Sequence, residues 1–257
     1  MENHSLAGPL ATLLALGEPK YARDFSWPDY RTFGIGAEHI TALIAISTDR
    51  ELIYLPDEKD ARGWGPIHAW RALGQLRAVE AIEPLICLFH EVPDNDWIIE
   101  EMPDVFALIG TEAFPALDRY LRDSTRPVYS RLIAATSITQ IAVTHPEMRE
   151  QAVEALVEQL VNFKQNSAGM NGVLIANLVE LEAVEKADLI QKVFSEGKVD
   201  RFIVGDWRDV KQRLRHPSGP AAIPGSKNLE RNVGSVPPDP LPKPNPQDSR
   251  DRPDAAQ

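Results

Sequence analysis

The sequence predicts an all-α fold, a right-handed α-solenoid of about four to five antiparallel helix pairs followed by a disordered C-terminal tail. Three observations predict it. Apolar residues recur at the three- and four-residue spacing of one helix face, short turns separate these stretches, and no segment alternates as a half-buried strand does. Because short turns join them, consecutive helices should be antiparallel neighbours.

The predicted helices form four successive pairs. They cover residues 66–76 with 78–90, 97–109 with 113–121, 128–141 with 146–163, and 172–181 with 183–194. Glycine, which often ends helices, stands between the second pair as Gly110 and closes the fourth as Gly197. The pairs begin near Ile67, Trp97 and Val128 and at Met170, a spacing of roughly 30 to 40 residues that is typical of helical-pair repeats.

Internal similarity supports a repeat. The pattern Leu-x-Ala-Val-Glu occurs at residues 76–80 and again at 181–185, and proline stands at matching places in two second helices, as Pro84 and Pro115. Each pair has an apolar stripe that it cannot bury alone, so stacking of the pairs is needed to form a core.

The two ends of the chain differ from this array. Residues 1–60 predict an irregular helical N-terminal cap with helices at 10–16 and 37–46, and residues 61–214 predict the repeat array, closed by a capping helix that Asp206 begins. Residues 215–257 predict a proline-rich disordered tail, since the 42 residues from His216 contain ten prolines and no aromatic residue. Within it, residues 237–246 favour polyproline II geometry, either as a docking site for a proline-recognising module or as a plain linker.

Charge and composition exclude several classes of function. The formal charge is −11 and no run of Lys or Arg is present, which argues against binding to nucleic acid or to an anionic membrane surface. The longest uncharged run, 132–145, is too short to span a bilayer, and the acidic N-terminus is unlike a signal peptide, so we expect a cytoplasmic protein. The single cysteine, Cys87, excludes a disulfide or a cysteine-based zinc site, and we expect it to be buried in a helix.

Residues 66–86 resemble HEAT-like repeats of the phycobilisome-lyase type. Residues 30–214 as a whole are similar to a group of bacterial HEAT-repeat proteins of unknown function, and 194–210 looks like the C-terminal signature of that group. Some members carry a C-terminal cysteine-rich SEC-C metal motif. This chain lacks it, since no cysteine follows Cys87. The resemblance therefore implies a HEAT-like fold and supplies no activity.

No constellation predicts catalysis, a bound cofactor or a metal. HEAT-repeat deoxyhypusine hydroxylases hold two irons through several His-Glu pairs, whereas only His90-Glu91 has that order here. Acidic residues surround Trp97 and either form a site for a cation or basic peptide or cap and complement the helix start: Asp94, Asp96, Glu100 and Glu101. Trp70 falls on an apolar stripe, while three tryptophans near helix starts pack between repeats or present an edge to a partner: Trp64, Trp97 and Trp207.

The predicted function is that of a non-catalytic scaffold or adaptor that binds another protein through a curved, mostly acidic face, with the oligomeric state left open. A partner with a basic patch would suit this face. The candidate partner-binding residues are Glu80, Glu83, Asp118, Arg119, Glu154, Glu158 and Trp97. The alternative is a bilin or tetrapyrrole lyase, or a chaperone of a chromophore protein, which would need a large apolar cavity lined by Arg71, Arg77 or Arg119.

Overall fold

The computed structural model describes residues 8–19, 27–55 and 60–215, and throughout these ranges the regular structure is helical, with no strand. The predicted proline-rich tail lies outside the described residues. No helix of the described ranges is long and apolar enough to cross a lipid bilayer. The α-helices are α1 (Pro9–Leu14), α2 (Ile40–Ser47), α3 (Arg50–Ile53), α4 (Gly65–Gln75), α5 (Ile82–Glu91), α6 (Asp96–Ile109), α7 (Phe114–Arg122), α8 (Val128–Thr144), α9 (Arg149–Leu160), α10 (Ala168–Glu180), α11 (Ala187–Ser195), α12 (Arg201–Val204) and α13 (Trp207–Arg215). The 3₁₀ turns are η1 (Tyr30–Phe33), η2 (Ala37–His39), η3 (Ala61–Trp64), η4 (Val79–Ala81), η5 (Thr111–Ala113), η6 (Pro146–Met148) and η7 (Val184–Lys186).

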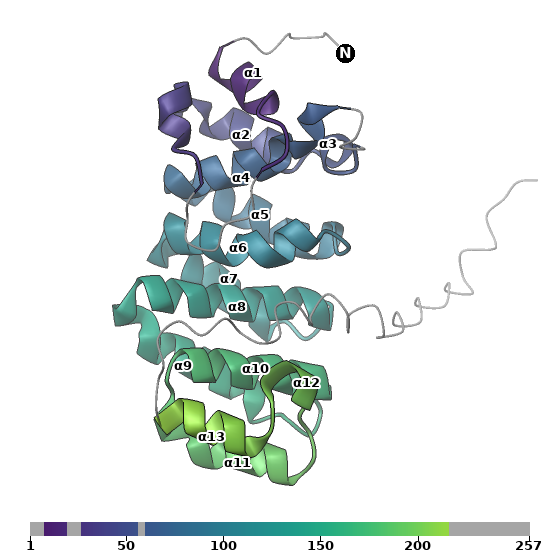
Figure 1. Cartoon of the computed structure of the whole chain (residues 1–257), viewed down its shortest axis with the longest axis vertical. Coiled ribbons are helices and arrows are strands. Elements are labelled where there is room, and N and C mark those ends of the chain that lie inside the picture. The colour runs from purple at the N-terminus through teal and green to yellow at the C-terminus, as the bar shows by residue number, and fades with distance from the viewer. Residues whose placement is uncertain (1–7, 20–26, 56–59, 216–257) are drawn as a thin grey trace, which may run out of the picture.

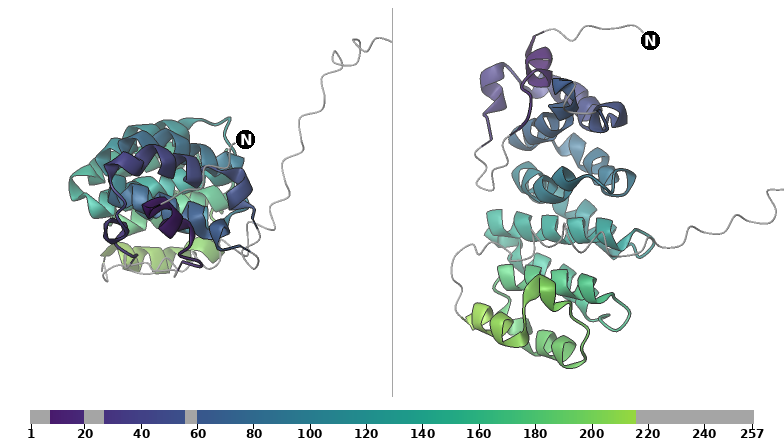
Figure 2. Two further views of the ribbon diagram at one scale, coloured as in Figure 1. Left: turned by 90° about the horizontal axis from the view of Figure 1, so that it is seen from above. Right: turned by 45° about the vertical axis from the view of Figure 1, so that its right-hand side comes forward.

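The helices are stacked along the long axis of the molecule (Figure 1). Helices α2, α4, α6, α8 and α10 contact one another in that order, and α5, α7 and α9 lie behind them in the view of Figure 1. The right-hand view in Figure 2 keeps this order, with α1 and α2 at one end and α11 and α13 at the other. Along α2, α4, α6, α8 and α10, which we call the first row, neighbours in space are therefore alternate helices in the sequence.

Helices α5, α7, α9 and α11, which we call the second row, share one feature at their start. Each of α5, α7, α9 and α11 follows directly on a 3₁₀ turn, and the second residue of each turn is glutamate. These residues are Glu80, Glu112, Glu147 and Glu185. A carboxylate in the first turn complements the positive end of the helix dipole, which explains why the same residue type recurs there.

The two Leu-x-Ala-Val-Glu segments adopt the same turn. Arg77 and Glu182, the variable residues, have left-handed φ values of 54° and 52°. The following alanine N–H donates to a carbonyl five residues earlier in both cases, from Ala78 to Leu73 at 3.0 Å and from Ala183 to Leu178 at 2.9 Å. This is the Schellman ending of a helix, and it turns the chain from α4 into α5 and from α10 into α11.

One continuous apolar core runs through the stack. Leucines and aromatic residues from successive helices are fully buried in it, each contributing about 1.5–3 kcal/mol on leaving water. Phe89 of α5 and Phe106 of α6 pack edge to face at a centroid distance of 5.9 Å. Helix α4 is buried on every side, from Gly65 to Gly74, so its polar residues must find partners inside the protein.

The predicted helices are present, and three details differ from prediction. Cys87 is exposed, because the buried side of α5 is formed by Leu85, Ile86, Leu88 and Phe89 and turns Cys87 outward. Helix α10 begins at Ala168, earlier than predicted, because the Ser167 hydroxyl accepts the Met170 N–H and caps it. Helix α6 is capped by Asn95 and not by Asp94 or Asp96, through a 3.3 Å bond from the Ile98 N–H to Asn95 Oδ1.

Candidate functional site

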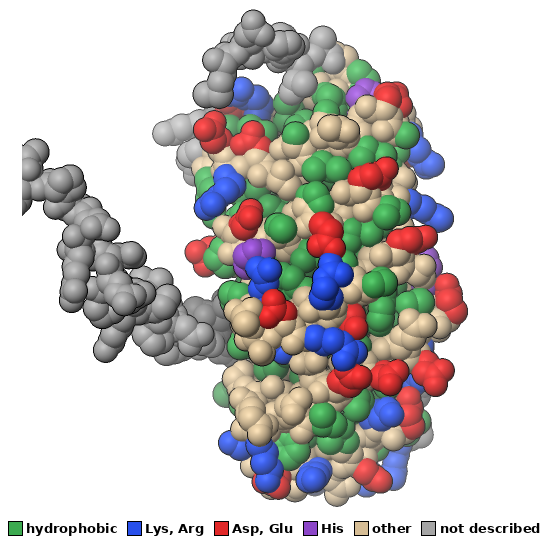
Figure 3. All heavy atoms as spheres, turned by 180° about the vertical axis from the view of Figure 1, so that it is seen from behind, with side chains coloured by type: hydrophobic (Ala, Val, Ile, Leu, Met, Phe, Trp, Pro, Cys, Tyr) green, Lys and Arg blue, Asp and Glu red, His purple; other side chains and the backbone are tan. Residues whose placement is uncertain are grey.

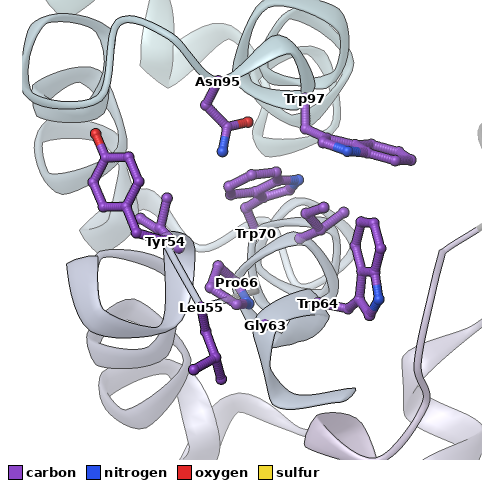
Figure 4. Close-up of a pocket in the computed structure, with 10 residues that line it drawn as sticks. Tyr54, Leu55, Gly63, Trp64, Pro66, Trp70, Asn95 and Trp97 are labelled. Carbon is purple, nitrogen blue, oxygen red and sulfur yellow. The ribbon is translucent and has the colours of Figure 1, made fainter. Parts of the chain in front are cut away.

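An aromatic recess of about 310 Å³ lies between α3, the η3 turn and the first turns of α4 and α6. We call it the tryptophan recess. Its lining residues are Ile53, Tyr54, Leu55, Gly63, Trp64, Pro66, Ile67, Trp70, Asn95 and Trp97. Figure 4 shows Trp70 at the centre, Asn95 and Pro66 on opposite sides of it, and Tyr54 across from Trp64 and Trp97.

Each wall is set by its local structure. Pro66 stands in the first turn of α4, where its lack of an N–H costs nothing. Gly63 leaves room for the chain opposite, since a Cβ at this position would lie 2.8 Å from the Leu55 carbonyl oxygen. Asn95 faces the recess because its side chain caps α6. Helix starts and a tight turn therefore place the polar and aromatic groups together.

The tryptophans differ in exposure. Trp70 is fully buried and forms the floor, whereas Trp64 and Trp97 are partly exposed and meet edge to face at 5.9 Å with an interplanar angle of 79°. Tyr54 has 56% of its surface exposed, which is unusual for a large aromatic residue. Rigid aromatic groups that remain open to solvent are favoured at the centres of binding sites.

A buried ion pair supports the floor. The side chains of Arg71 and Glu101 are 1% and 2% exposed. Arg71 Nε donates to Glu101 Oε2 at 2.7 Å, and a terminal guanidinium nitrogen donates to Oε1. The Trp70 indole N–H also donates to Oε2, at 3.3 Å. The Arg71 guanidinium lies over the Trp27 ring at 5.0 Å and near the Trp97 ring at 5.9 Å, as cation–π geometry requires.

Glu101 therefore has a different role from the predicted one. As a member of the acidic group around Trp97, it was expected either to bind a cation or to complement the positive end of α6. In the structure its carboxylate is buried and paired with Arg71 of α4, the helix that packs against α6. A salt bridge with this burial holds α4 and α6 in one relative position, because separating the charges in a dry interior is costly.

A second buried pair joins the N-terminal segment to α4. The Tyr30 hydroxyl lies 2.7 Å from His68 Nδ1, and His68 Nε2 lies 2.9 Å from the Gly17 carbonyl oxygen. Because a carbonyl can only accept, Nε2 carries the proton and Nδ1 accepts from Tyr30. Burial lowers the pKa of His68 and raises the pKa of Tyr30, so both side chains are neutral at neutral pH.

The predicted acidic face carries charges of both signs. Glu83 on α5 pairs with Arg119 on α7, and Arg122 bridges Asp118 on its own helix and Glu158 on α9. Figure 3, which shows this side of the molecule, has red and blue side chains interspersed. Sequence reasoning missed Arg122, whose spacing of four residues from Asp118 is a recognisable helix-surface pair.

The remaining candidate residues are spread out. Glu80 and Glu154 are exposed, and neither forms an ion pair within the described residues. Trp97 lies apart from this face, in the tryptophan recess. The seven predicted residues thus divide between a charged surface on the second-row helices and the recess.

In the part of the chain that the structure describes, no three His, Cys, Asp or Glu side chains are placed to hold a metal ion. His90 Nδ1 lies 3.1 Å from the Tyr120 hydroxyl, and its Nε2 lies 3.0 Å from an Arg126 guanidinium nitrogen. Burial, followed by the nearby Glu91 and Glu83, raises the pKa of Cys87, so its thiol is not activated as a nucleophile.

Comparison with known proteins adds no relationship: no family model, no curated protein and no solved structure matches the chain. The geometry of the recess and of the charged face is therefore the basis on which a function is proposed.

Proposed function

We propose that this chain is a HEAT-like α-solenoid that acts as a non-catalytic scaffold or adaptor and binds another protein. The repeating unit supports the solenoid. One unit recurs along residues 65–195. It consists of a first-row helix, a tight turn, a 3₁₀ turn that contains glutamate, and a second-row helix. Solenoids expose long surfaces for binding, so this architecture favours an interaction role.

The tryptophan recess is the single observation that carries the proposed site. It is open to solvent, while Trp70 and the Arg71–Glu101 pair hold its floor in place, so little ordering entropy is lost when a ligand enters. Its volume of about 310 Å³ is at the lower end of the range for ligand pockets. That size suits one or two apolar side chains of a peptide segment.

The charged second-row face remains a secondary candidate. Its acids would attract a basic partner, but Arg119 and Arg122 neutralise Glu83, Asp118 and Glu158 locally. Exposed pairs of this kind contribute about 0–1 kcal/mol and are easily exchanged for a partner's charges. This face therefore suits the rim of an interface better than its centre.

The tetrapyrrole alternative has no specific observation in its favour. Arg71 is buried against Glu101, Arg77 lies in the turn after α4, and Arg119 is exposed on α7. None of the three lines the recess. Titration with bilin or heme, followed by absorption, tests this alternative directly.

A peptide-display selection tests the proposed site. Random peptides are selected on the full chain, and the binding of the selected peptides is then measured on the Tyr54→Ala variant. Phe202→Ala is the matched control, since Phe202 is also an exposed aromatic residue, at 79%. We expect apolar or aromatic peptides whose binding falls about tenfold or more in Tyr54→Ala and is unchanged in Phe202→Ala. Peptides that bind both variants as well as the unchanged chain, or no enrichment at all, would remove the recess as the site.

A further inference from the structure

Residues 215–257 contain a proline-rich segment whose sequence favours one backbone geometry. Proline fixes φ near the polyproline II value, and residues 237–246, Pro-Pro-Asp-Pro-Leu-Pro-Lys-Pro-Asn-Pro, hold six prolines in ten residues. That helix has three residues per turn and a rise of about 3.1 Å, so residues three apart share one edge. In that geometry Pro238, Leu241 and Pro244 would share such an edge, wholly apolar, with steps of about 9 Å. We call these three residues the proline ridge.

We propose that the tryptophan recess binds the proline ridge of its own chain, an inference that rests on the recess being the peptide site proposed above. Proline-rich segments bind to grooves walled by aromatic rings, because the flat rings pack against the pyrrolidines of a ligand that is already extended. Trp64 and Tyr54 supply such walls on opposite sides of the recess (Figure 4).

Hydrogen bonding supports this occupant. A polyproline II backbone leaves its carbonyl oxygens without internal partners, so a binding site needs donors. The side-chain oxygen of Asn95 caps α6, its amide nitrogen makes no hydrogen bond with other described residues, and that nitrogen turns toward the recess in Figure 4. It can donate to a carbonyl group of the ligand.

Nearby charges also fit this occupant. Asp94 and Asp96, next to Asn95, are exposed, and their negative charges add to the effect of burial in raising the pKa of Tyr129, which places them close to the start of α8. The only cation in the proline segment, Lys243, directly precedes Pro244 of the ridge. Asp94 and Asp96 flank Asn95 in the chain and lie outside the lining of the recess, and their negative charges can attract the lysine when the ridge is seated.

The connection is long enough. From α6 to α13 the stack passes through α8 and α10, three contacts of about 8–10 Å each, or roughly 30 Å. The 22 residues from His216 to Pro237 have an average span of about 26 Å as a flexible coil and reach about 68 Å when extended. A tether of this length gives an effective concentration on the order of millimolar, so the tail of the same chain outcompetes that of a second copy.

Docking of the tail would make the site self-inhibited. A partner's peptide must displace the ridge, so its apparent affinity is lower than its intrinsic affinity by the fraction of open recess. Removing the ridge from the tail should then tighten the binding of every peptide that uses the recess.

Indole N–H signals in NMR spectra of the full chain test the proposal. All five tryptophans precede the tail, and single Trp→Phe variants assign their signals. The ridge variant carries Pro238→Ser, Leu241→Ser and Pro244→Ser, and the matched control carries Pro217→Ser, Pro220→Ser and Pro224→Ser. We expect the ridge variant to shift the Trp64 and Trp97 signals and to leave Trp207 unchanged, and we expect no shift in the control.

A synthetic peptide of residues 234–248 completes the experiment. Added to the ridge variant, it should return both signals to their original positions in a saturable way, and Tyr54→Ala should weaken it about tenfold. Saturation by the peptide without any effect of the ridge variant would overturn docking of the chain's own tail and leave the recess as a peptide site. Shifts that grow with protein concentration would assign the ridge to a second copy and overturn the intramolecular proposal.

Two further results separate this proposal from the function itself. If the free peptide does not bind while displayed peptides still depend on Tyr54, the proline ridge is wrong as the occupant and the adaptor function stands. If display on the ridge variant, whose recess is not occupied by the tail, also selects no peptide that depends on Tyr54, the recess is not a binding site and both proposals fall.

Discussion

The buried pair of Arg71 and Glu101 gives the sharpest test of the packing described above. In Glu101→Leu, the guanidinium of Arg71 remains inside the protein without its carboxylate. In Arg71→Met, the carboxylate remains with a single donor, the Trp70 indole N–H. The double variant removes both charges and replaces them with apolar side chains of similar size.

The expected magnitudes follow from these contacts. Removing one member of a buried pair costs about 3–5 kcal/mol, because a charge stays in a dry interior without its counter-charge. The double variant avoids that cost and leaves one unsatisfied donor, the Trp70 N–H, at about 1–3 kcal/mol. Each single change should therefore destabilise the protein more than the two together, and the coupling between the sites should be at least about 3 kcal/mol.

Urea unfolding followed by far-ultraviolet circular dichroism measures these free energies. We expect the midpoints of both single variants to fall well below that of the double variant, with a similar dependence on urea in all four proteins. Two single variants that each lose less than about 1 kcal/mol, or losses that simply add in the double variant, would refute the pairing and with it the rigid floor of the recess.

Three other predictions follow from single residues. Burial lowers the pKa of His68 below its ordinary 6.5, so below that pH the unfolded chain binds a proton at His68 that the native protein does not. As the pH is lowered from 6.5 to the pKa of the folded state, the free energy of unfolding should therefore decrease by up to about 1.4 kcal/mol per pH unit. Arg77→Gly and Glu182→Gly should each stabilise the protein by roughly 0.5–1 kcal/mol in thermal or urea unfolding, since glycine relieves a left-handed backbone at some entropic cost. Because Cys87 is exposed, it should react completely with iodoacetamide in the native chain. Because its pKa is raised, the reaction at neutral pH should be slower than that of a free thiol and should become faster as the pH rises, which mass spectrometry can measure.

Each of these has its own control. The pKa of His90 is lowered in the same direction, so the contribution of His68 is the difference between the unchanged protein and His68→Gln, and an equal slope in both would disprove it. Glycine at Glu185, where the backbone is helical, should destabilise; if all three glycine variants behave alike, strain at the turns is not the cause. A Cys87 that reacts only in urea would contradict its exposure.

The sequence was sufficient to predict the order of the helices. Apolar spacing from Pro66 to Phe194 follows the buried faces closely, because each helix packs one stripe against its neighbours. Helix ends were harder to place, since they depend on which polar side chain turns back to the backbone. At α6 the choice among Asp94, Asn95 and Asp96 is made by geometry that no spacing encodes.

The candidate site was largely hidden from the sequence. Arg71 and Glu101 are 30 residues apart on different helices, and a single sequence does not say which buried charges meet. One signal was present: Arg71 has only apolar neighbours from Ala69 to Gly74, where a charge needs a partner. Tyr54 and Gly63 were missed because they lie where the helical pattern is weakest.

The close contact between α4 and α6 has a consequence for the width of the recess. A methyl group on Gly74 would approach the Val105 carbonyl oxygen to 3.3 Å and Leu108 to 3.4 Å, so this glycine lets the two helices converge at the ends remote from Trp64 and Trp97. A larger residue there would act as a wedge and tilt one helix against the other about its middle. Ligand preference could then change through a substitution that never touches the ligand.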